Sequence, residues 1–264
     1  LSYSIATPGC NFRCAWCQNW EISQMPRERH LIGGHPAAPG QIVADARRRN
    51  CRSIAYTYTE PTIFAEFARD TARLAREKGL RNVFVSNGFM TETSATAMAD
   101  VLDGDNIDLK SFSDRFYRKV CKAKLQPVLD TITRMKKLGV WVEVTTLLIP
   151  GLNDSDEELR DIAQFLQATG PEIPWHVTAF YPTYKLLDRP PTPLATLRRA
   201  REIGLAAGLR YVYTGNIPGD PGENTFCPGC DHLLIERSGF AIRQNRIVDG
   251  VCPECGARID GVWQ

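Results

Sequence analysis

The chain has 264 residues, of which 43% are hydrophobic, so it can bury the core of one large domain with a small additional module. Its 32 basic and 30 acidic residues give a net charge of only +2, which gives no indication of a nucleic-acid or membrane partner bound through overall charge. No apolar run approaches the ~18 residues of a membrane span, and no signal peptide is recognisable. The chain opens at Leu1 directly into a predicted strand, so we expect it to be a fragment of a longer protein.

Strands and helices are predicted to alternate from the start of the chain to about residue 213. The predicted strands are 2–6, 53–57, 83–85, 107–109, 140–149, 176–180 and 211–213. The helices between them include 42–48, one that opens at Pro61 and ends at Gly79, one capped by Thr91, one with an apolar stripe over 128–138, one with Ser155 and Glu158 as a capping box, and one that starts at Thr192 and Pro193. This alternation predicts βαβ crossovers and a parallel sheet. We expect an α/β fold, a partial (β/α)6 barrel over residues 1–216, with its active site at the carboxyl ends of the strands.

The alternation stops after Gly215, and the segment that follows has a different composition. Pro218, Gly219, Pro221 and Gly222 are typical of a linker. Residues 223–264 contain four cysteines and are predicted to form a separate metal-binding module.

Three of the nine cysteines follow the first predicted strand with the spacing C-x3-C-x2-C: Cys10, Cys14 and Cys17. Tight clusters and an odd total in a chain without a secretory signal indicate metal ligation rather than disulfides, and a reducing, cytoplasmic compartment. Three thiolates on one loop can bind three irons of a 4Fe–4S cube and leave the fourth iron open for a ligand. The alternative is a zinc loop that takes its fourth ligand from elsewhere. Cys51 and Cys121 are isolated and are interpreted as packing residues.

Polar residues and one proline are assigned to the ends of the predicted strands, and a plain structural alternative exists for three of these positions. The set comprises Thr59, Glu60, Pro61, Ser86, Asn87, Asp108, Lys110, Thr145 and His176. Glu60 could simply favour the start of a helix, Asn87-Gly88 could be an ordinary turn, and His176 could be a core or rim histidine.

The cysteine loop, with Trp16 before its third cysteine, resembles that of radical S-adenosylmethionine (SAM) enzymes. The resemblance implies that the open iron chelates SAM and that Cys10, Cys14 and Cys17 start the chemistry. Thr59-Glu60-Pro61 is similar to the family's Gly-Gly-Glu-Pro segment, which implies that Glu60 accepts a hydrogen bond from the SAM ammonium; Tyr58 and Thr59 stand where the glycines usually are.

Further segments resemble the activating enzymes of glycyl-radical proteins. The resemblance of Ser86-Asn87-Gly88-Phe89 implies that Ser86 and Asn87 contact SAM, with the ribose as the expected group. Val85 stands where the family has an acidic residue. Asp108-Leu109-Lys110 and Thr145 match the same group, and His176 completes the set as a candidate contact.

Longer strings over most of the chain are similar to AmmeMemoRadiSam proteins, which resemble the activase of pyruvate formate-lyase. These strings are 9–24, 56–62, 174–176 and 211–216. The resemblance implies an oxidoreductase or activase that uses flavodoxin or ferredoxin as its electron donor and is associated with Memo-like and Ammecr-like proteins. No substrate is implied.

The second cluster consists of two C-x2-C knuckles, Cys227 with Cys230 and Cys252 with Cys255. Two such knuckles predict a closed, tetrahedral site for one Zn or one Fe ion. The expected inner residues of this module are Phe226, Leu233, Leu234, Ile235, Phe240, Ile242, Ile247, Val248 and Val251. A protein without catalytic activity, either an iron–sulfur electron carrier or a zinc-ribbon adaptor, would also explain both cysteine clusters. It would not explain the polar residues at the strand ends.

Overall fold

The computed structural model describes residues 1–263. It divides into two compact units, which are described separately. Unit 1 comprises Leu1–Leu109, Ser113–Val142 and Thr183–Leu187, and unit 2 comprises Lys110–Phe112, Glu143–Pro182 and the chain from Asp188 onward.

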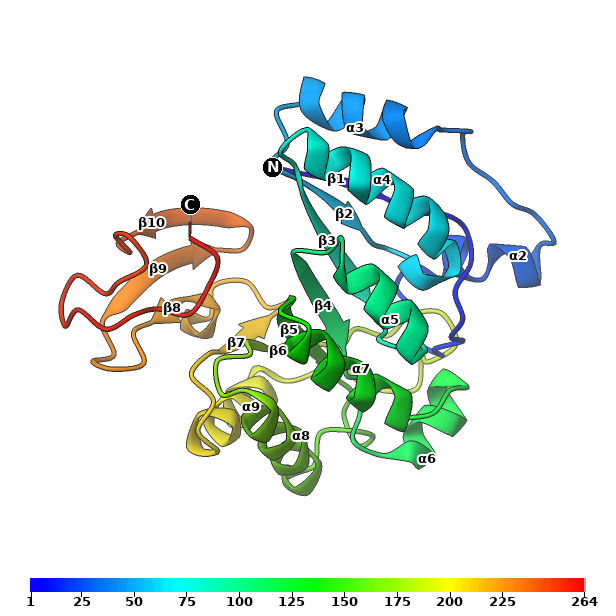
Figure 1. The fold of residues 1–264 in the computed structure, drawn as a ribbon. Helices are drawn as coiled ribbons and strands as arrows, with labels where there is room; N and C mark the ends of the chain where they lie inside the picture. Colours follow the sequence, from blue (N-terminus) through cyan, green and yellow to red (C-terminus); the bar gives the residue numbers. More distant parts are fainter. Residues whose placement is uncertain (264) are drawn as a thin grey trace. The chain divides into compact units, whose positions relative to one another are not determined.

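Unit 1 contains four parallel strands that neighbour one another in chain order: β1 (Ser2–Ile5), β2 (Ser53–Tyr56), β3 (Arg81–Ser86) and β4 (Gly104–Asp108). Its helices are α1 (Trp20–Ser23), α2 (Met25–Glu28), α3 (Pro39–Arg48), the 3-10 turn η1 (Pro61–Phe64), α4 (Ala65–Glu77), α5 (Glu92–Ala99), α6 (Asp114–Phe116), the π-helical turn η2 (Tyr117–Cys121) and α7 (Gln126–Lys137). Helices α3, α4 and α5 follow one another along one face of these strands (Figure 1). Buried side chains of the strands, such as Ile54, Phe84 and Ile107, form the core of this unit.

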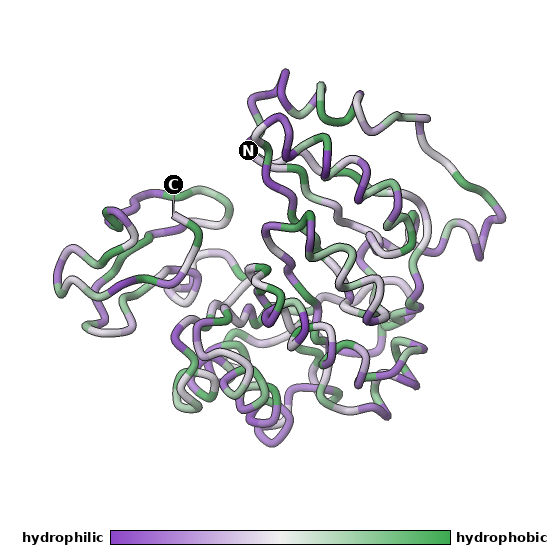
Figure 2. Tube along the Cα trace, in the orientation of Figure 1, coloured by the Kyte–Doolittle hydropathy of each residue, from purple (hydrophilic) through white to green (hydrophobic). Residues whose placement is uncertain are grey.

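Unit 2 contains nearly all of β5 (Trp141–Leu148), followed by β6 (Trp175–Ala179) and β7 (Val212–Gly215), which are parallel and again in chain order. Helices α8 (Asp156–Thr169) and α9 (Leu194–Ala206) lie side by side (Figure 1). Along the long helices, hydrophilic and hydrophobic residues alternate within each turn (Figure 2), as expected where one helix face packs on a core. After η3 (Pro221–Glu223), the chain forms an antiparallel sheet of β8 (Thr225–Phe226), β9 (Leu233–Ser238) and β10 (Ala241–Asn245), with β9 in the middle.

The predicted fold class is confirmed: seven parallel strands follow in chain order, helices connect them, and a four-cysteine group occurs near the C-terminal end. Thr91 caps α5 as predicted, because its hydroxyl accepts a hydrogen bond from the amide of Ser94. The predicted capping box at the start of α8 is confirmed for Ser155 and wrong for Glu158. Ser155 does accept from the amide of Glu158, but the Glu158 carboxylate accepts hydrogen bonds from Ser111 and from the amide of Phe112 instead of returning to Ser155. Within residues 1–263, no helix combines the length and apolar composition needed to cross a bilayer.

The hydrophobic core of the cysteine-rich module differs from the predicted one. Leu234 and Ile235 are buried as expected, but Phe240, Ile242 and Val248 are largely exposed. Phe240 follows Gly239 at the turn between β9 and β10, where its side chain is exposed. The core is completed instead by Tyr211, next to β7, and by Ile259. We propose that the chain divides at about residues 216–223. Tyr211 precedes this division but packs in the core of the cysteine-rich module.

Candidate active site

The loop that carries Cys10, Cys14 and Cys17 follows β1 and leads into α1. Gly9 opens the loop with a φ of +116°, and a Cβ at this position would lie 2.9 Å from Cδ1 of Ile63, so the loop requires glycine here. The Cys14 side chain is buried, and Cys10 and Cys17 are half-buried.

Backbone hydrogen bonds from two other segments hold this loop in place. The amide of Arg13 donates to the carbonyl of Cys121 over 2.9 Å, and the amide of Ala15 donates to the carbonyl of Val120 over 3.1 Å. The carbonyl of Ala15 accepts from the amide of Lys185 over 2.9 Å. The cysteine loop therefore depends on η2 and on the 183–187 segment for its shape.

Aromatic side chains pack between the cysteines. The Phe12 ring makes edge contacts with Phe89 and Tyr117, at centroid distances of 5.5 and 6.1 Å. Trp16, the aromatic residue before the third cysteine, is buried and packs on Phe116 at 5.4 Å. These contacts bury the Phe12 and Trp16 side chains against neighbouring elements.

The sulfur atoms are supplied with polar neighbours that suit iron ligands. Sγ of Cys10 accepts from the amide of Phe12 over 3.3 Å and from Nδ2 of Asn87 over 3.8 Å, and Sγ of Cys17 lies 3.2 Å from the Ser23 hydroxyl. Hydrogen bonds to thiolate sulfur stabilise its charge and tune an iron–sulfur cluster. Three thiols on one clamped loop with such donors fit a 4Fe–4S cluster.

Glu60 lies directly after β2 and is almost completely buried, with 1% of its surface exposed. Its Oε1 accepts hydrogen bonds from the amide and hydroxyl of Thr62 and from the hydroxyl of Ser86, and its Oε2 accepts from the amide of Asn87 over 2.7 Å. Burial raises the pKa of Glu60, and these four donors act in the opposite direction. The carboxylate is therefore surrounded by protein donors, and its clearest role is to hold the ends of β2 and β3 together.

Asn87 connects this carboxylate site to the cysteine loop. Besides its contact with Cys10, Nδ2 of Asn87 donates to Oδ1 of Asn11 over 2.7 Å. Nδ2 of Asn11 lies 3.4 Å from both the Thr62 hydroxyl and the Phe89 carbonyl. Asn11 was not among the predicted site residues; its position directly after Cys10 was the available signal.

Tyr58 and Thr59, which replace two expected glycines, keep features suited to a binding segment. Tyr58 has a φ of +65°, the left-handed conformation that glycine adopts most easily. The Thr59 hydroxyl is buried and has no hydrogen-bond partner within the described residues. A buried hydroxyl left without a partner fits a site completed by a polar ligand such as SAM.

Strand β4 contributes two acidic residues, of which only one was predicted. Asp108 ends the strand and is half-buried. Asp105 is buried, and neither of its carboxylate oxygens has a hydrogen-bond partner within residues 1–263. Burial, followed by the charges of Glu60 and Asp108, raises the pKa of Asp105 well above its ordinary value. The fold therefore disfavours the charged form of Asp105.

The remaining predicted residues belong to unit 2. The Lys110 carbonyl accepts from Nδ2 of Asn153 over 2.7 Å, and Thr145 is paired in register with His176. His176 is the second residue of β6 and so lies at the amino end of that strand, not at the carboxyl end as predicted. Its Nε2 lies 2.7 Å from Oε2 of Glu143, and its ring stacks on Tyr213.

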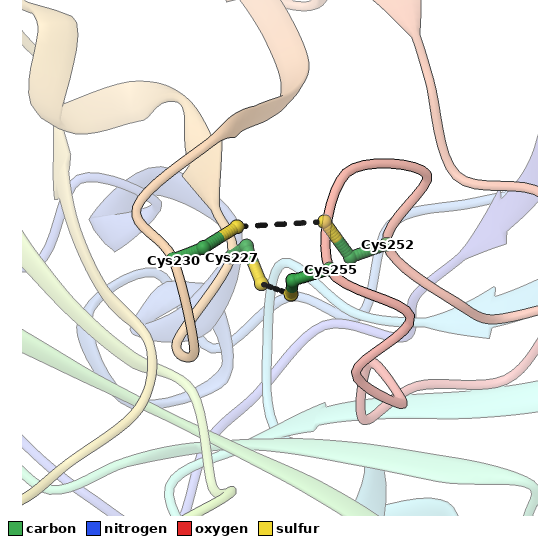
Figure 3. A group of neighbouring side chains, drawn as sticks. All are labelled: Cys227, Cys230, Cys252 and Cys255. Atoms are coloured by element: carbon green, nitrogen blue, oxygen red, sulfur yellow. Dashed lines mark hydrogen bonds between the residues drawn. The ribbon is translucent and has the colours of Figure 1, made fainter.

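The four C-terminal cysteines converge as predicted from their spacing (Figure 3). The four sulfur atoms lie within 4.8 Å of one another. Sγ of Cys227 is 3.6 Å from Sγ of Cys255, and Sγ of Cys230 is 3.7 Å from Sγ of Cys252. Sulfurs at ~2.3 Å from a tetrahedrally bound ion are separated by about 3.8 Å, so this group fits a Zn or Fe ion.

Comparisons with known proteins agree with this site. The family model described as the Radical SAM superfamily matches residues 4–166. An uncharacterized protein of Methanocaldococcus jannaschii is 48% identical over 260 residues, which cover 97% of this chain and 77% of that protein. Pyruvate formate-lyase 1-activating enzyme of Escherichia coli is 22% identical over 233 residues, covering 78% of this chain and 89% of the enzyme.

A solved domain of the pyruvate-formate lyase-activating enzyme from Bacteroides vulgatus has the same fold, with a TM-score of 0.54 at 18% identity, and covers 62% of this chain and 99% of that domain. The family match spans more than half of the chain and includes the cysteine loop, Glu60 and Asn87. The chain therefore belongs to the radical SAM superfamily and is an enzyme of the radical SAM type.

Proposed function

We propose that Cys10, Cys14 and Cys17 bind three irons of a 4Fe–4S cluster whose fourth iron binds SAM. Such a cluster, once reduced, supplies the electron that cleaves SAM to a 5′-deoxyadenosyl radical, which abstracts a hydrogen atom from the substrate. The observation that supports this most strongly is the contact of Asn87 with both Cys10 and Asn11, together with its amide bond to Glu60. Through these bonds the cysteine loop and the ends of β2 and β3 form one connected polar network.

Within this proposal, the chain's own residues divide into ligands and residues that orient the cofactor. Thr59, Pro61, Ser86, Asp108, Lys110 and Thr145 are the proposed SAM contacts besides Asn87, and His176 is retained as a more distant contact on the basis of its register with Thr145. Glu60 is proposed to act mainly through Ser86 and Asn87, because its carboxylate is enclosed by protein donors.

We further propose an activase-type reaction in which the hydrogen is taken from a partner protein. The similarity to pyruvate formate-lyase 1-activating enzyme supports this class of substrate. A flavodoxin or ferredoxin is the proposed electron donor, and Memo-like and Ammecr-like proteins are proposed partners. The four-cysteine group is proposed to bind a structural Zn or Fe ion.

Anaerobic reconstitution tests the central step. The protein is loaded with iron and sulfide, mixed with SAM and dithionite, and assayed for 5′-deoxyadenosine. We expect release that depends on both SAM and reductant, and no release from a variant in which Cys14 is replaced by Ala. A fully loaded protein that binds SAM but releases no 5′-deoxyadenosine under these conditions would contradict the proposal. The alternative of an electron carrier or adaptor predicts neither SAM binding nor release of 5′-deoxyadenosine.

A further inference from the structure

A basic surface borders the cysteine loop of unit 1. The segment 113–125 contains five basic residues and one acidic residue, a net charge of +4, whereas the whole chain carries +2. We define the basic surface as these five side chains with two neighbours, all exposed: Arg13, Arg115, Arg118, Lys119, Lys122, Lys124 and Lys185. The single acidic residue of the segment, Asp114, pairs with Arg118.

Hydrogen bonds place this surface directly against the proposed cluster ligands. The carbonyls of Val120 and Cys121 accept from the amides of Ala15 and Arg13, which flank Cys14 in the sequence. Lys185 joins the same loop through its amide bond to Ala15. The segment that carries five of the basic side chains is therefore hydrogen-bonded to the loop on which the cluster is proposed to be bound. Lys185 also pairs with Glu28.

The backbone that presents these side chains is unusual. Tyr117–Cys121 forms a π-helical turn, and Lys122 has a φ of +60°. π-Helical turns occur frequently at functional sites, and the left-handed conformation is unfavourable for a lysine relative to an ordinary helical conformation. A strained backbone that persists beside a cofactor loop points to a function for the surface it exposes.

The proposed reaction needs one electron from outside the chain for each SAM cleaved. We propose that the basic surface is the docking site of an acidic one-electron carrier protein of the flavodoxin or ferredoxin class. The donor loses one electron, the cluster held by the cysteine loop gains it, and no atom changes partner. This inference rests on the proposed function and identifies where the donor binds.

Charge distribution favours an acidic protein over a nucleic acid. The two partners would both be attracted by lysines and arginines. However, the segment beside the cysteine loop has a net charge of +4, and the chain as a whole is close to neutral. An electron donor must approach the cluster closely, whereas a nucleic acid gains no affinity from binding beside the cluster.

Charge reversal tests the docking site by a binding measurement on the reconstituted protein. The probes are an oxidised bacterial flavodoxin and an oxidised 2Fe–2S ferredoxin, both of net negative charge. We expect at least one to bind, and the double variant Lys119→Glu/Lys122→Glu to raise its Kd at least tenfold at low salt, with the difference shrinking as salt is added. The matched control, Arg47→Glu/Arg49→Glu, changes the same charge at exposed positions at the end of α3 and should alter Kd less than twofold.

Failure of docking is distinguishable from failure of the proposed function. Dithionite needs no docking site, so 5′-deoxyadenosine release driven by dithionite, and the iron content, should be the same in both double variants and the parent. The inference is overturned if neither carrier binds, if both double variants weaken binding equally, or if a short DNA duplex binds the parent more tightly than the carriers and loses affinity in Lys119→Glu/Lys122→Glu alone.

Discussion

The amide nitrogen of Asn87 lies 2.7 Å from Oε2 of Glu60, and this bond joins the ends of the neighbouring strands β2 and β3. Asn87 in turn donates to Asn11 and contacts Cys10. A change at Glu60 can therefore reach the cysteine loop by two routes, through Asn87 and through the Thr62 hydroxyl, which lies 3.4 Å from Nδ2 of Asn11. Glu60 is accordingly the residue at which to test how the site is organised.

Replacing Glu60 by Gln should weaken SAM binding and leave the cluster in place. The variant loses charge-assisted hydrogen bonds and turns an amide NH2 toward existing donors, at a cost of roughly 1.5–3 kcal/mol, or about ten- to a hundredfold in Kd. Equilibrium binding of SAM and iron analysis of the reconstituted variant measure both effects. Glu66→Gln, at an exposed position of α4, serves as the control. An unchanged SAM affinity would show that Glu60 supports only the local fold.

Gly88→Ala should destabilise the protein more than Gly79→Ala. Both glycines have a positive φ, +71° and +74°, so both substitutions incur the left-handed cost of about 1–2 kcal/mol. Only at Gly88 would the new Cβ meet a neighbour, Cγ2 of Ile107 at 2.6 Å, which adds an overpacking cost of about 1–3 kcal/mol. Chemical denaturation of the two variants checks the difference. Equal losses would mean that β4 moves freely away from Gly88.

The alternation of strands and helices and the four-cysteine group were predictable because they depend on local patterns. Apolar periodicity identified the alternating elements, and the spacing of the two C-x2-C pairs predicted that the four C-terminal sulfurs converge. The assignment of Cys10, Cys14 and Cys17 as cluster ligands stays a prediction. The hydrogen-bonding of Glu60 was not predictable, because its partners Ser86 and Asn87 come from another strand. The same holds for Asp105, whose burial depends on the packing of the sheet, and for Phe240, which reads as a core residue but lies exposed at a hairpin turn.

Removing any one of Cys10, Cys14 or Cys17 should abolish both the cluster and SAM cleavage. Each thiol is expected to bind a different iron, so no remaining ligand can replace it. Iron and sulfide analysis, visible absorbance and 5′-deoxyadenosine release measure the loss after Ala substitution. Cys51→Ala, which changes a half-buried cysteine outside the loop, should behave as the parent. Retention of a full cluster in the triple Ala variant would refute the assignment of these ligands.

Asp105→Asn should stabilise the protein, and increasingly so as the pH rises. The folded-state pKa of Asp105 is raised well above its ordinary value of 3.8, first by burial and then by Glu60 and Asp108. Below that ordinary value the residue is protonated in both states. Above it, only the unfolded state ionises freely, so the free energy of unfolding falls until the pH passes the folded-state pKa. Asn is neutral at every pH, so the variant does not lose unfolding free energy in this way as the pH rises.

Urea denaturation at pH 5 and pH 8 measures this effect. The variant's advantage over the parent should be larger at pH 8. Asp70→Asn, at an exposed position of α4, is the control and should show no comparable change with pH. An advantage for Asp105→Asn that is the same at both pH values would mean that Asp105 is ionised in the folded protein through a partner acquired in solution.

The C-terminal module should retain one tightly bound ion when the cluster ligands are absent. Its core is small, with Leu234, Ile235 and Ile259 as the main buried aliphatic residues, and a module of about 40 residues rarely folds on so little apolar burial. An ion between the two knuckles would cross-link the ends of the segment 231–251 and supply the missing stability. We therefore expect one equivalent of metal in a variant in which Cys10, Cys14 and Cys17 are all Ala. Elemental analysis separates Zn from Fe, and a rubredoxin-like visible spectrum would identify Fe. Cys252→Ser in that background should release the ion and expose the module to proteolysis, whereas Cys51→Ser should not. A metal-free module that still resists proteolysis would show that Tyr211 and the small core suffice.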